Sequence, residues 1–450
     1  MFQLLDMLDT VTATPDTVAA TPDKVEAFNS YCETKAYPQI RELMTRYEPF
    51  IIWYDTPGPI PLENARMFRK IVKDHDRSTL VCNRIGRLLG DYDSFPDGVV
   101  SEIPLALSWE TCMISSGGWA YKPSAEDPLK GKSCVELIKN LCKICSNGGV
   151  FLLNLGPKSD GSIPGYYPVV WREVGRWVKK HAEAIYGTQA NPLAAAWPNL
   201  YCTTKDNKLY LFIPNQKQFE ADGAYEITGE KIASGSHRME TWSRPEVVDL
   251  SHLRNEIKKV HFLSSGTEVP IDKKNGATLV CLPKAEDAIC DVLVVETAGA
   301  VEVEDRSLPQ ADERGVITIL PKDLYVSLPA GKRKKFEAIS VPDDDRDCTI
   351  VSLSWYMKTF ASFMVDQAGE YDLEVVLKTP EYALDDLIVR INGRYGNIAD
   401  VPISNRKSTR VVKGFNLTKG VNSLVLSTGS GNRDLTKYIL IKSIRLRRKP

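Results

Sequence analysis

The chain has 450 residues, of which 57 are basic and 58 acidic, so its formal net charge at pH 7 is −1. This balance argues against a nucleic-acid-binding protein, which concentrates positive charge on one face. No apolar run approaches the ~20 residues that a membrane-spanning helix requires, and we predict no membrane span. The length allows two or three domains, each with a core of its own.

The first part of the chain predicts one helical region. Residues 1–24 contain little large apolar content beyond the first few positions and are expected to form a disordered or atypical lead. From about residue 24 to 47 apolar residues recur at helical spacing, and Pro38 is expected to kink or divide this helix.

Strands and helices then alternate up to about residue 190. Four short apolar runs predict strands at 50–55, 79–83, 105–110 and 150–155. Longer amphipathic stretches predict helices at 62–75, 133–147 and 165–184. This alternation is typical of a parallel sheet with its functional site at the carboxyl ends of the strands. Because a complete (β/α)8 barrel has eight strands, residues 25–190 are predicted to form a partial barrel, its C-terminal half.

The remainder of the chain predicts antiparallel β-structure, so the expected fold class is α/β plus all-β. Short strands separated by turns predict a β-sandwich at residues 192–298. Residues 299–340 are expected to be a connector that holds a strand or two. Residues 341–450 predict a jelly-roll-like domain similar to the modules that many carbohydrate-active enzymes append, and we expect it to bind sugar.

Cys142 and Cys145 form a C-x-x-C sequence, which occurs in redox and zinc sites. No second pair follows to complete a zinc site, and both cysteines fall on the apolar face of the predicted helix 133–147. Packing in a hydrophobic core is therefore the favoured interpretation, and we predict neither a metal nor an organic cofactor.

Two carboxylates carry the functional prediction. Asp55 ends the predicted strand 50–55 and is followed by a Thr-Pro-Gly-Pro loop, and Glu110 ends the predicted strand 105–110. Two acids at two strand ends suit a glycosidase, which uses one as nucleophile or base and the other as proton donor. Carboxyl separations of ~5–5.5 Å favour retention of configuration and ~6.5–9.5 Å favour inversion.

A series of short motifs surrounds these acids in a characteristic order. They are Trp53-Tyr54-Asp55, Asn83-Arg84, Gly90-Asp91-Tyr92, Trp109-Glu110-Thr111-Cys112-Met113, Gly118-Trp119-Ala120-Tyr121, the run Gly148 to Pro157, Asp160-Gly161 and Glu183-Ala184-Ile185-Tyr186-Gly187. Together they resemble the α-L-fucosidase family of retaining glycoside hydrolases. The resemblance covers residues 35–190 and, more loosely, the β-domain up to about 298.

The resemblance implies a role for each motif residue. Asp55 matches the family's nucleophile and Glu110 matches a residue that serves as acid/base in part of the family, with Glu102, Asp93 and Asp97 as alternatives. Arg84 matches an arginine that contacts the sugar, and Trp53 and Trp119 match aromatic positions that line its pocket. The implied partner is a fucosylated glycan or glycoside. Thr56 stands where the family usually has glycine, which we expect to reshape the pocket mouth.

Structural interpretations compete with some of these roles. Arg84 could instead pair with Asp91, and Trp119 could belong to the core rather than to a pocket wall. Asn154 is expected to satisfy backbone groups of the loop after its strand.

The four predicted strands cannot close a barrel, and all five histidines follow Asp55, whereas the family takes histidines from its first barrel half. We therefore expect this chain alone to hydrolyse α-L-fucosides weakly or not at all. The alternative is a non-catalytic glycan-binding remnant. The family resemblance implies a secreted, periplasmic or lysosomal location, although residues 1–8 lack the basic region of a signal peptide.

Overall fold

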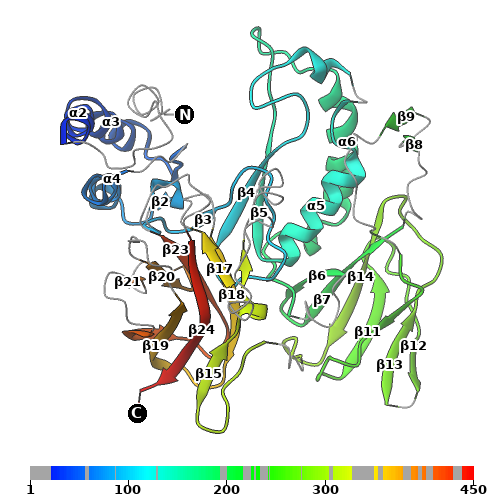
Figure 1. Ribbon diagram of the computed structural model, residues 1–450. Helices are drawn as coiled ribbons and strands as arrows, with labels where there is room; N and C mark the ends of the chain where they lie inside the picture. The colour runs from blue at the N-terminus through cyan, green and yellow to red at the C-terminus, as the bar shows by residue number, and fades with distance from the viewer. Residues whose placement is uncertain are drawn as a thin grey trace. The chain divides into compact units, whose positions relative to one another are not determined.

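The computed structural model divides the chain into two compact units (Figure 1). The first comprises Met1–Val99, Leu105–Glu110 and Leu308–Pro450, and the second comprises Val100–Pro104 and Thr111–Ser307. The residues that the structure describes are 22–55, 60–86, 88–127, 130–192, 200–215, 224–227, 230–233, 242, 244–274, 276–303, 308–326, 349–352, 358–378, 387–393, 398–401, 409–428 and 438–449.

The first unit opens with the predicted helical region. Helix α2 (Pro22–Tyr31) continues through a π-helical turn (Cys32–Ala36) into α3 (Tyr37–Tyr47). Pro38 stands in the first turn of α3, directly after the π-helical turn, so the helical region is divided near Pro38 as predicted. Helix α4 (Leu62–His75) has the predicted bounds and packs against this region around Phe68 and Met44.

Parallel strand pairing follows the helices. Strand β1 (Ile51–Ile52) pairs in parallel with β2 (Leu80–Val81). A parallel bridge joins Cys82 to Tyr92, and the next two residues form β3 (Asp93–Ser94), which pairs in parallel with β4 (Trp109–Ile114). Strand β5 (Gly149–Asn154) lies beside β4 in the same sheet. The described residues between 50 and 155 thus contain five strands, β1 to β5, where four were predicted.

Two strand predictions were wrong. Strand β3 was missed because Asp93 and Ser94 are polar and give no apolar run. The predicted strand 105–110 lies instead at 109–114, so Glu110 is the second residue of β4 and not its end. Leu105 and Leu107 are buried in a loop before β4, and the Ala106 amide of this loop donates to Ser423 Oγ at 2.7 Å.

The C-terminal part of the first unit is a sandwich of two antiparallel sheets, here called the C-terminal sandwich. One sheet has the order β15-β24-β19-β22 with β17 also paired to β24, and the other has the order β16-β18-β23-β20-β21. Their bounds are β15 Val316–Ile319, β16 Tyr325–Val326, β17 Thr349–Ser352, β18 Thr359–Val365, β19 Gly369–Lys378, β20 Leu387–Ile391, β21 Ile398–Val401, β22 Thr409–Leu417, β23 Gly420–Thr428 and β24 Tyr438–Arg448.

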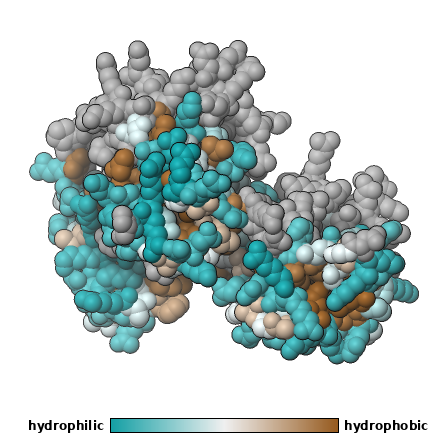
Figure 2. Space-filling view, turned by 90° about the horizontal axis from the view of Figure 1, so that it is seen from below, coloured by the Kyte–Doolittle hydropathy of each residue, from teal (hydrophilic) through white to brown (hydrophobic). Residues whose placement is uncertain are grey.

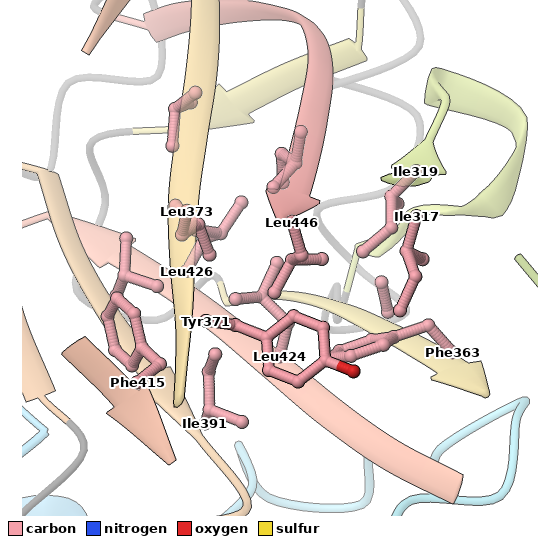
Figure 3. Packing of buried hydrophobic residues seen from close by; sticks show 14 of the residues in the cluster. Ile317, Ile319, Phe363, Tyr371, Leu373, Ile391, Phe415, Leu424, Leu426 and Leu446 are labelled. Carbon is pink, nitrogen blue, oxygen red and sulfur yellow. The ribbon is translucent and has the colours of Figure 1, made fainter. Parts of the chain in front are cut away.

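Buried side chains from both sheets fill the core of the C-terminal sandwich (Figure 3). Phe363 and Leu424 from one sheet meet Tyr371 and Leu446 from the other. Strands β15 and β16 lie in the predicted connector 299–340, yet each pairs within a sheet of the sandwich. Residues 316–326 therefore belong to this domain rather than to a linker.

The second unit places helices on one antiparallel sheet. Helices α5 (Cys134–Ser146) and α6 (Tyr166–Lys180) share a core with that sheet, whose order is β11-β14-β7-β6. Cys142 is fully buried there, so its predicted core packing is confirmed. The strands of this unit are β6 Tyr201–Lys205, β7 Lys208–Pro214, β8 Ala224–Ile227, β9 Glu230–Ala233, β10 Val247–Asp249, β11 Ile257–Phe262, β12 Ile271–Lys274, β13 Ala277–Cys281 and β14 Cys290–Thr297.

The opposite face of this sheet packs on a second antiparallel sheet, β10-β13-β12, around Leu211, Phe262 and Val280. Figure 2, seen from below, shows hydrophilic residues around an apolar centre in this part of the chain, at the right of the view. Short 3-10 turns occur at Asn83–Ile85, Pro123–Glu126, Ala182–Ala184 and Pro321–Asp323. Among the described residues, no helix is long and apolar enough to cross a membrane.

Candidate functional site

The side chains of Trp53 and Asp55, which follow β1, point to the same side of the chain. Residues two apart in an extended segment point to one face, which brings both side chains toward the turn that follows β2. Asp55 remains partly accessible, with 18% of its side chain exposed. Thr56, the departure from the family pattern, lies outside the described residues.

Arg84 connects these two residues. It lies in the 3-10 turn Asn83–Ile85, directly after β2, and its Nη1 donates to Asp55 Oδ1 at 3.1 Å. Its guanidinium carbon lies 4.5 Å from the centroid of the Trp53 ring, a cation–π contact. The planar guanidinium is thus held by a carboxylate at one edge and by an aromatic face.

Further contacts fix Arg84 from the side of β3. Nε donates to Ser94 Oγ at 3.0 Å, and Nη2 donates to the Phe95 carbonyl at 3.1 Å. Nη2 also pairs with Asp97 at 2.7 Å. The alternative partner Asp91 is instead bound by two cations of α4, Arg69 at 2.7 Å and Lys73 at 2.8 Å.

Glu110 joins the same group of residues through Trp53. The indole Nε1 of Trp53 donates to Glu110 Oε1. In the β3–β4 register Glu110 stands beside Ser94, whose hydroxyl contacts Arg84, so both side chains are on one face of the strand pair. Trp53, Asp55, Arg84 and Glu110 therefore form one connected cluster, here called the acid cluster.

The two oxygens of Glu110 differ in what they can do. An indole N–H donates and cannot accept a hydrogen bond, so Oε1 must act as an acceptor. A proton on Glu110 then belongs on Oε2, which fixes the oxygen from which it would be delivered. Trp109, the sequence neighbour of Glu110, points to the opposite face and stacks on Phe95 with ring centroids 4.7 Å apart.

The alternative acids have distinct environments. Asp93 is fully buried and ion-paired with Lys358 and Arg390. Burial opposes its ionisation, but the two cations outweigh burial and lower the pKa of Asp93 to about 2, so it is no proton donor near neutral pH. Asp97 is half exposed on Arg84, and Glu102 pairs with Lys143 at 2.5 Å.

Trp119 belongs to the second unit, where 42% of its surface is exposed. It is therefore not a core residue, and its place in a pocket wall stays a prediction. Asn154 Nδ2 donates to the carbonyls of Gly118 at 3.3 Å and Trp119 at 3.0 Å. Asn154 therefore binds loop backbone as expected, but in the loop after β4 that carries Trp119 and not in the loop after its own strand.

Two buried residues beside the acid cluster escaped the sequence analysis. The Cys82 thiol accepts from the Tyr54 amide at 3.1 Å, and burial raises its pKa to about 12. Burial, together with Cys82 and Glu110, raises the pKa of Tyr92, and the Tyr92 hydroxyl has no hydrogen-bond partner among the described residues. The Gly90-Asp91-Tyr92 motif contained the signal for Tyr92, whereas nothing local marked Cys82.

The described residues hold no group of three or more histidine, cysteine or acidic side chains that could bind a metal ion. The chemistry available to the acid cluster is that of two carboxyl groups, a guanidinium and an indole. A carboxylate can attack an electrophilic carbon or accept a proton, and a second carboxyl can donate one.

Comparison with known proteins identifies relatives of the first part of the chain. The family described as Alpha-L-fucosidase matches residues 8–183. The plasma alpha-L-fucosidase of Rattus norvegicus is 31% identical over 197 residues, which are 40% of this chain and 41% of the rat protein. The chain thus matches about two fifths of the length of this relative.

Solved structures are similar at lower identity. An alpha-L-fucosidase from Vibrio sp. strain EJY3 has 19% identity and a TM-score of 0.49, covering 94% of this chain and 71% of that chain. The alpha-fucosidase of Thermotoga maritima, solved in complex with fucose, has 19% identity and a TM-score of 0.44, covering 61% of this chain and 57% of that chain.

Proposed function

From the premise that residues 8–183 belong to the α-L-fucosidase family, we propose that the protein hydrolyses terminal α-L-fucosyl residues of glycans. One observation carries the proposal. The acid cluster joins Asp55 and Glu110 through Arg84 and Trp53, so two carboxyl groups flank one guanidinium and one indole. A glycosidase needs two acids beside the same sugar.

In the proposed retaining mechanism Asp55 is the nucleophile. Its carboxylate attacks the anomeric carbon while Glu110 gives a proton to the departing oxygen, so the glycosidic bond breaks as a fucosyl–Asp55 ester forms. Glu110 then removes a proton from water, and the resulting hydroxyl displaces Asp55. The indole on Oε1 assigns both transfers to Oε2 of Glu110.

Arg84 and Trp53 orient these groups. The bond from Nη1 to Oδ1 fixes the rotation of the Asp55 carboxylate, and guanidinium donors suit sugar hydroxyls as well. Aromatic faces such as Trp53 and Trp119 suit the apolar C–H face of a 6-deoxy sugar. Asp97, half exposed on the same guanidinium, is the reserve proton donor.

The test is turnover of an aryl α-L-fucoside by the full chain and by Asp55→Asn. We expect aryl release by the wild type to be weak, in keeping with the predicted partial barrel, and to fall by at least ~10³-fold in the variant, the order found when a nucleophile is removed. Proton NMR of the first product should show the α-anomer, and an inverted product would contradict the retaining mechanism. A Glu110→Gln variant should be rescued by azide, and azide rescue of Asp97→Asn alone would transfer the acid/base role to Asp97.

The non-catalytic alternative makes a different prediction. Fucose binding in calorimetry without turnover by the wild type would favour a glycan-binding protein. Neither binding nor turnover would overturn both assignments.

A further inference from the structure

Asp93 is at the centre of a buried charge cluster outside the acid cluster. Lys358 Nζ donates to Asp93 Oδ1, and Arg390 Nη2 donates to Asp93 Oδ2. The side chains of Asp93 and Arg390 are fully buried and that of Lys358 is 12% exposed. Both cations come from the C-terminal sandwich, Lys358 just before β18 and Arg390 within β20.

Such a cluster needs an explanation other than stability. Removing ions from water costs so much that well-packed apolar side chains of similar volume often stabilise a protein equally well or better. Apolar contacts, however, do not fix the orientation of the groups that they join. Charge-assisted hydrogen bonds do, and a guanidinium with several acceptors holds each of them at a defined place.

Among the described residues, the acceptors of Arg390 lie between Leu88 and Asp93, in the segment that follows Arg84. Besides Asp93, Arg390 Nη1 donates to the carbonyls of Leu88 at 3.1 Å and Gly90 at 2.8 Å. The Gly90 amide in turn donates to Asn83 Oδ1 at 3.1 Å. Arg390 of the sandwich therefore holds the loop that follows Arg84 at two of its carbonyls.

Asp93 passes this restraint to Arg84 by two routes. Asn83, the residue before Arg84, donates from Nδ2 to Asp93 Oδ1 at 2.8 Å. Ser94, the residue after Asp93, accepts from Arg84 Nε at 3.0 Å. The backbone that carries Arg84 and the acceptor that orients its guanidinium are thus both tied to one carboxylate.

We propose that Lys358 and Arg390 are positioning residues of the acid cluster. They fix Asp93, Asp93 sets the place of Arg84, and Arg84 orients the Asp55 carboxylate. This inference rests on the proposed function for its kinetic consequence. It makes the C-terminal sandwich a support of the reaction, whether or not its own surface binds sugar.

The test compares Lys358→Met with Lys358→Arg in the full chain. Displacing a reacting group by about 1 Å can cost ~10²-fold in rate. We expect Lys358→Met to lower kcat by about 10- to 100-fold and to change KM by less than about 3-fold. The reason is that the Asp55 carboxylate is misdirected while most sugar contacts remain. Lys358→Arg restores the charge and should recover kcat to within about 3-fold of the wild type.

Phe363→Leu is the matched control for loss of stability. Phe363 lies on β18, the strand that begins directly after Lys358, and its ring faces the sandwich core. It is Phe360, and not Phe363, that contacts Phe95. At a temperature well below its melting midpoint, Phe363→Leu should keep kcat. An equal loss of kcat in Phe363→Leu and Lys358→Met at matched melting midpoints would overturn the inference, and so would an unchanged kcat in Lys358→Met.

Two further measurements cover the remaining outcomes. If Lys358→Met does not fold, Arg390→Lys takes its place, and an unchanged kcat there would overturn the inference. If the wild type shows no turnover, the proposed function fails while the positioning can still be measured. The Arg84 Nε–H resonance, assigned with Arg84→Lys, should shift in Lys358→Met and return in Lys358→Arg, and an unmoved resonance would overturn the inference.

Discussion

Asp55 and Asp93 each bind an arginine in the first unit, but the surroundings of the two pairs differ. Asp55 is 18% exposed and its partner Arg84 also contacts Trp53, whereas Asp93 and Arg390 are both fully buried. The Asp55–Arg84 pair, here called the open pair, leaves the Asp55 carboxylate accessible to a substrate. The Asp93–Arg390 pair, here called the closed pair, is not reached by solvent and can only hold the backbone in place.

The strands β3 and β4 separate these two environments. Ser94 and Glu110 point to the face of the acid cluster, and Asp93 and Trp109 point to the face of the C-terminal sandwich. Alternation along a strand produces this division, because neighbouring residues face opposite sides. In a barrel the outer face of each strand is covered by a helix. Here the C-terminal sandwich covers the face of β3 that bears Asp93, and the described residues between β3 and β4 contain no helix.

The strongest way to break the closed pair is Asp93→Asn. The amide keeps the shape but leaves Lys358 and Arg390 buried without an anion, which should cost about 3–5 kcal/mol of unfolding free energy. Urea unfolding measures the loss. The control is Glu374→Gln, which removes the partner of Arg445 at the surface of the same sandwich and should cost at most ~0.5 kcal/mol. Equal losses in the two variants would contradict the importance of burial.

Gly90→Ala should disturb both pairs at once. A Cβ at Gly90 would lie 2.4 Å from the backbone of Asn83, so the loop or the turn with Arg84 has to move. Overpacking at a backbone contact is expected to cost about 3 kcal/mol and to lower kcat as well. Gly98→Ala, where φ is +72° and the added Cβ has open space, serves as the comparison for conformational strain alone. A fully active, stable Gly90→Ala would show that the close approach is not needed.

Acid should open the closed pair. The pKa of Asp93 is lowered from 3.8 to about 2, so the native state holds the ionised form more strongly than the unfolded chain does. The ionised Asp93 contributes about 2 kcal/mol to the free energy of unfolding. This contribution is complete above pH 4 and is lost as the pH falls from 4 through 2. Asp93→Asn should remove that part of the acid dependence, as measured by urea unfolding at several pH values. An identical acid profile in the two proteins would refute the assignment.

The smallest expected effect lies in the open pair. Trp53→Phe keeps an aromatic face under Arg84 but removes the donor to Glu110 Oε1. Loss of one hydrogen bond to a charged group corresponds to about 1.5 kcal/mol, or about 10-fold in kcat if it acts in the transition state. Steady-state kinetics across pH measures both the rate and the alkaline limb of the profile, which reports the proton donor. A profile identical to the wild type would show that the indole N–H does not select the reacting oxygen.

Neither pair was predicted from the sequence, although the residues of the Asp55–Arg84 pair were both named as site residues. The family resemblance named Trp53, Asp55 and Arg84, and the apolar runs before Asp55 and Arg84 predicted the strands that fold as β1 and β2. Helix 62–75 was predicted to the residue because its amphipathic pattern is long and begins after Pro61. The strand predicted at 105–110 lies at 109–114, because an apolar loop and an apolar strand look alike in sequence.

The buried charge cluster could not be predicted in this way. Asp93 is 265 residues from Lys358 and 297 from Arg390 along the chain, and a two-residue strand has no period to detect. Asp93 was considered only as a reserve acid, since a lone aspartate carries no sign of distant cations. Contacts of this range are set by the packing of one domain on another rather than by local propensity.

The placement of Lys358 and Arg390 has a consequence for how such proteins diversify. Exchanging the C-terminal β-region between homologues by recombination would import foreign side chains opposite Asp93. Unless lysine and arginine arrive in the same places, the hybrid inherits an unneutralised carboxylate in its interior. The partners are therefore expected to be inherited together, and libraries of chimeras should lose expression whenever the crossover separates Asp93 from its two cations.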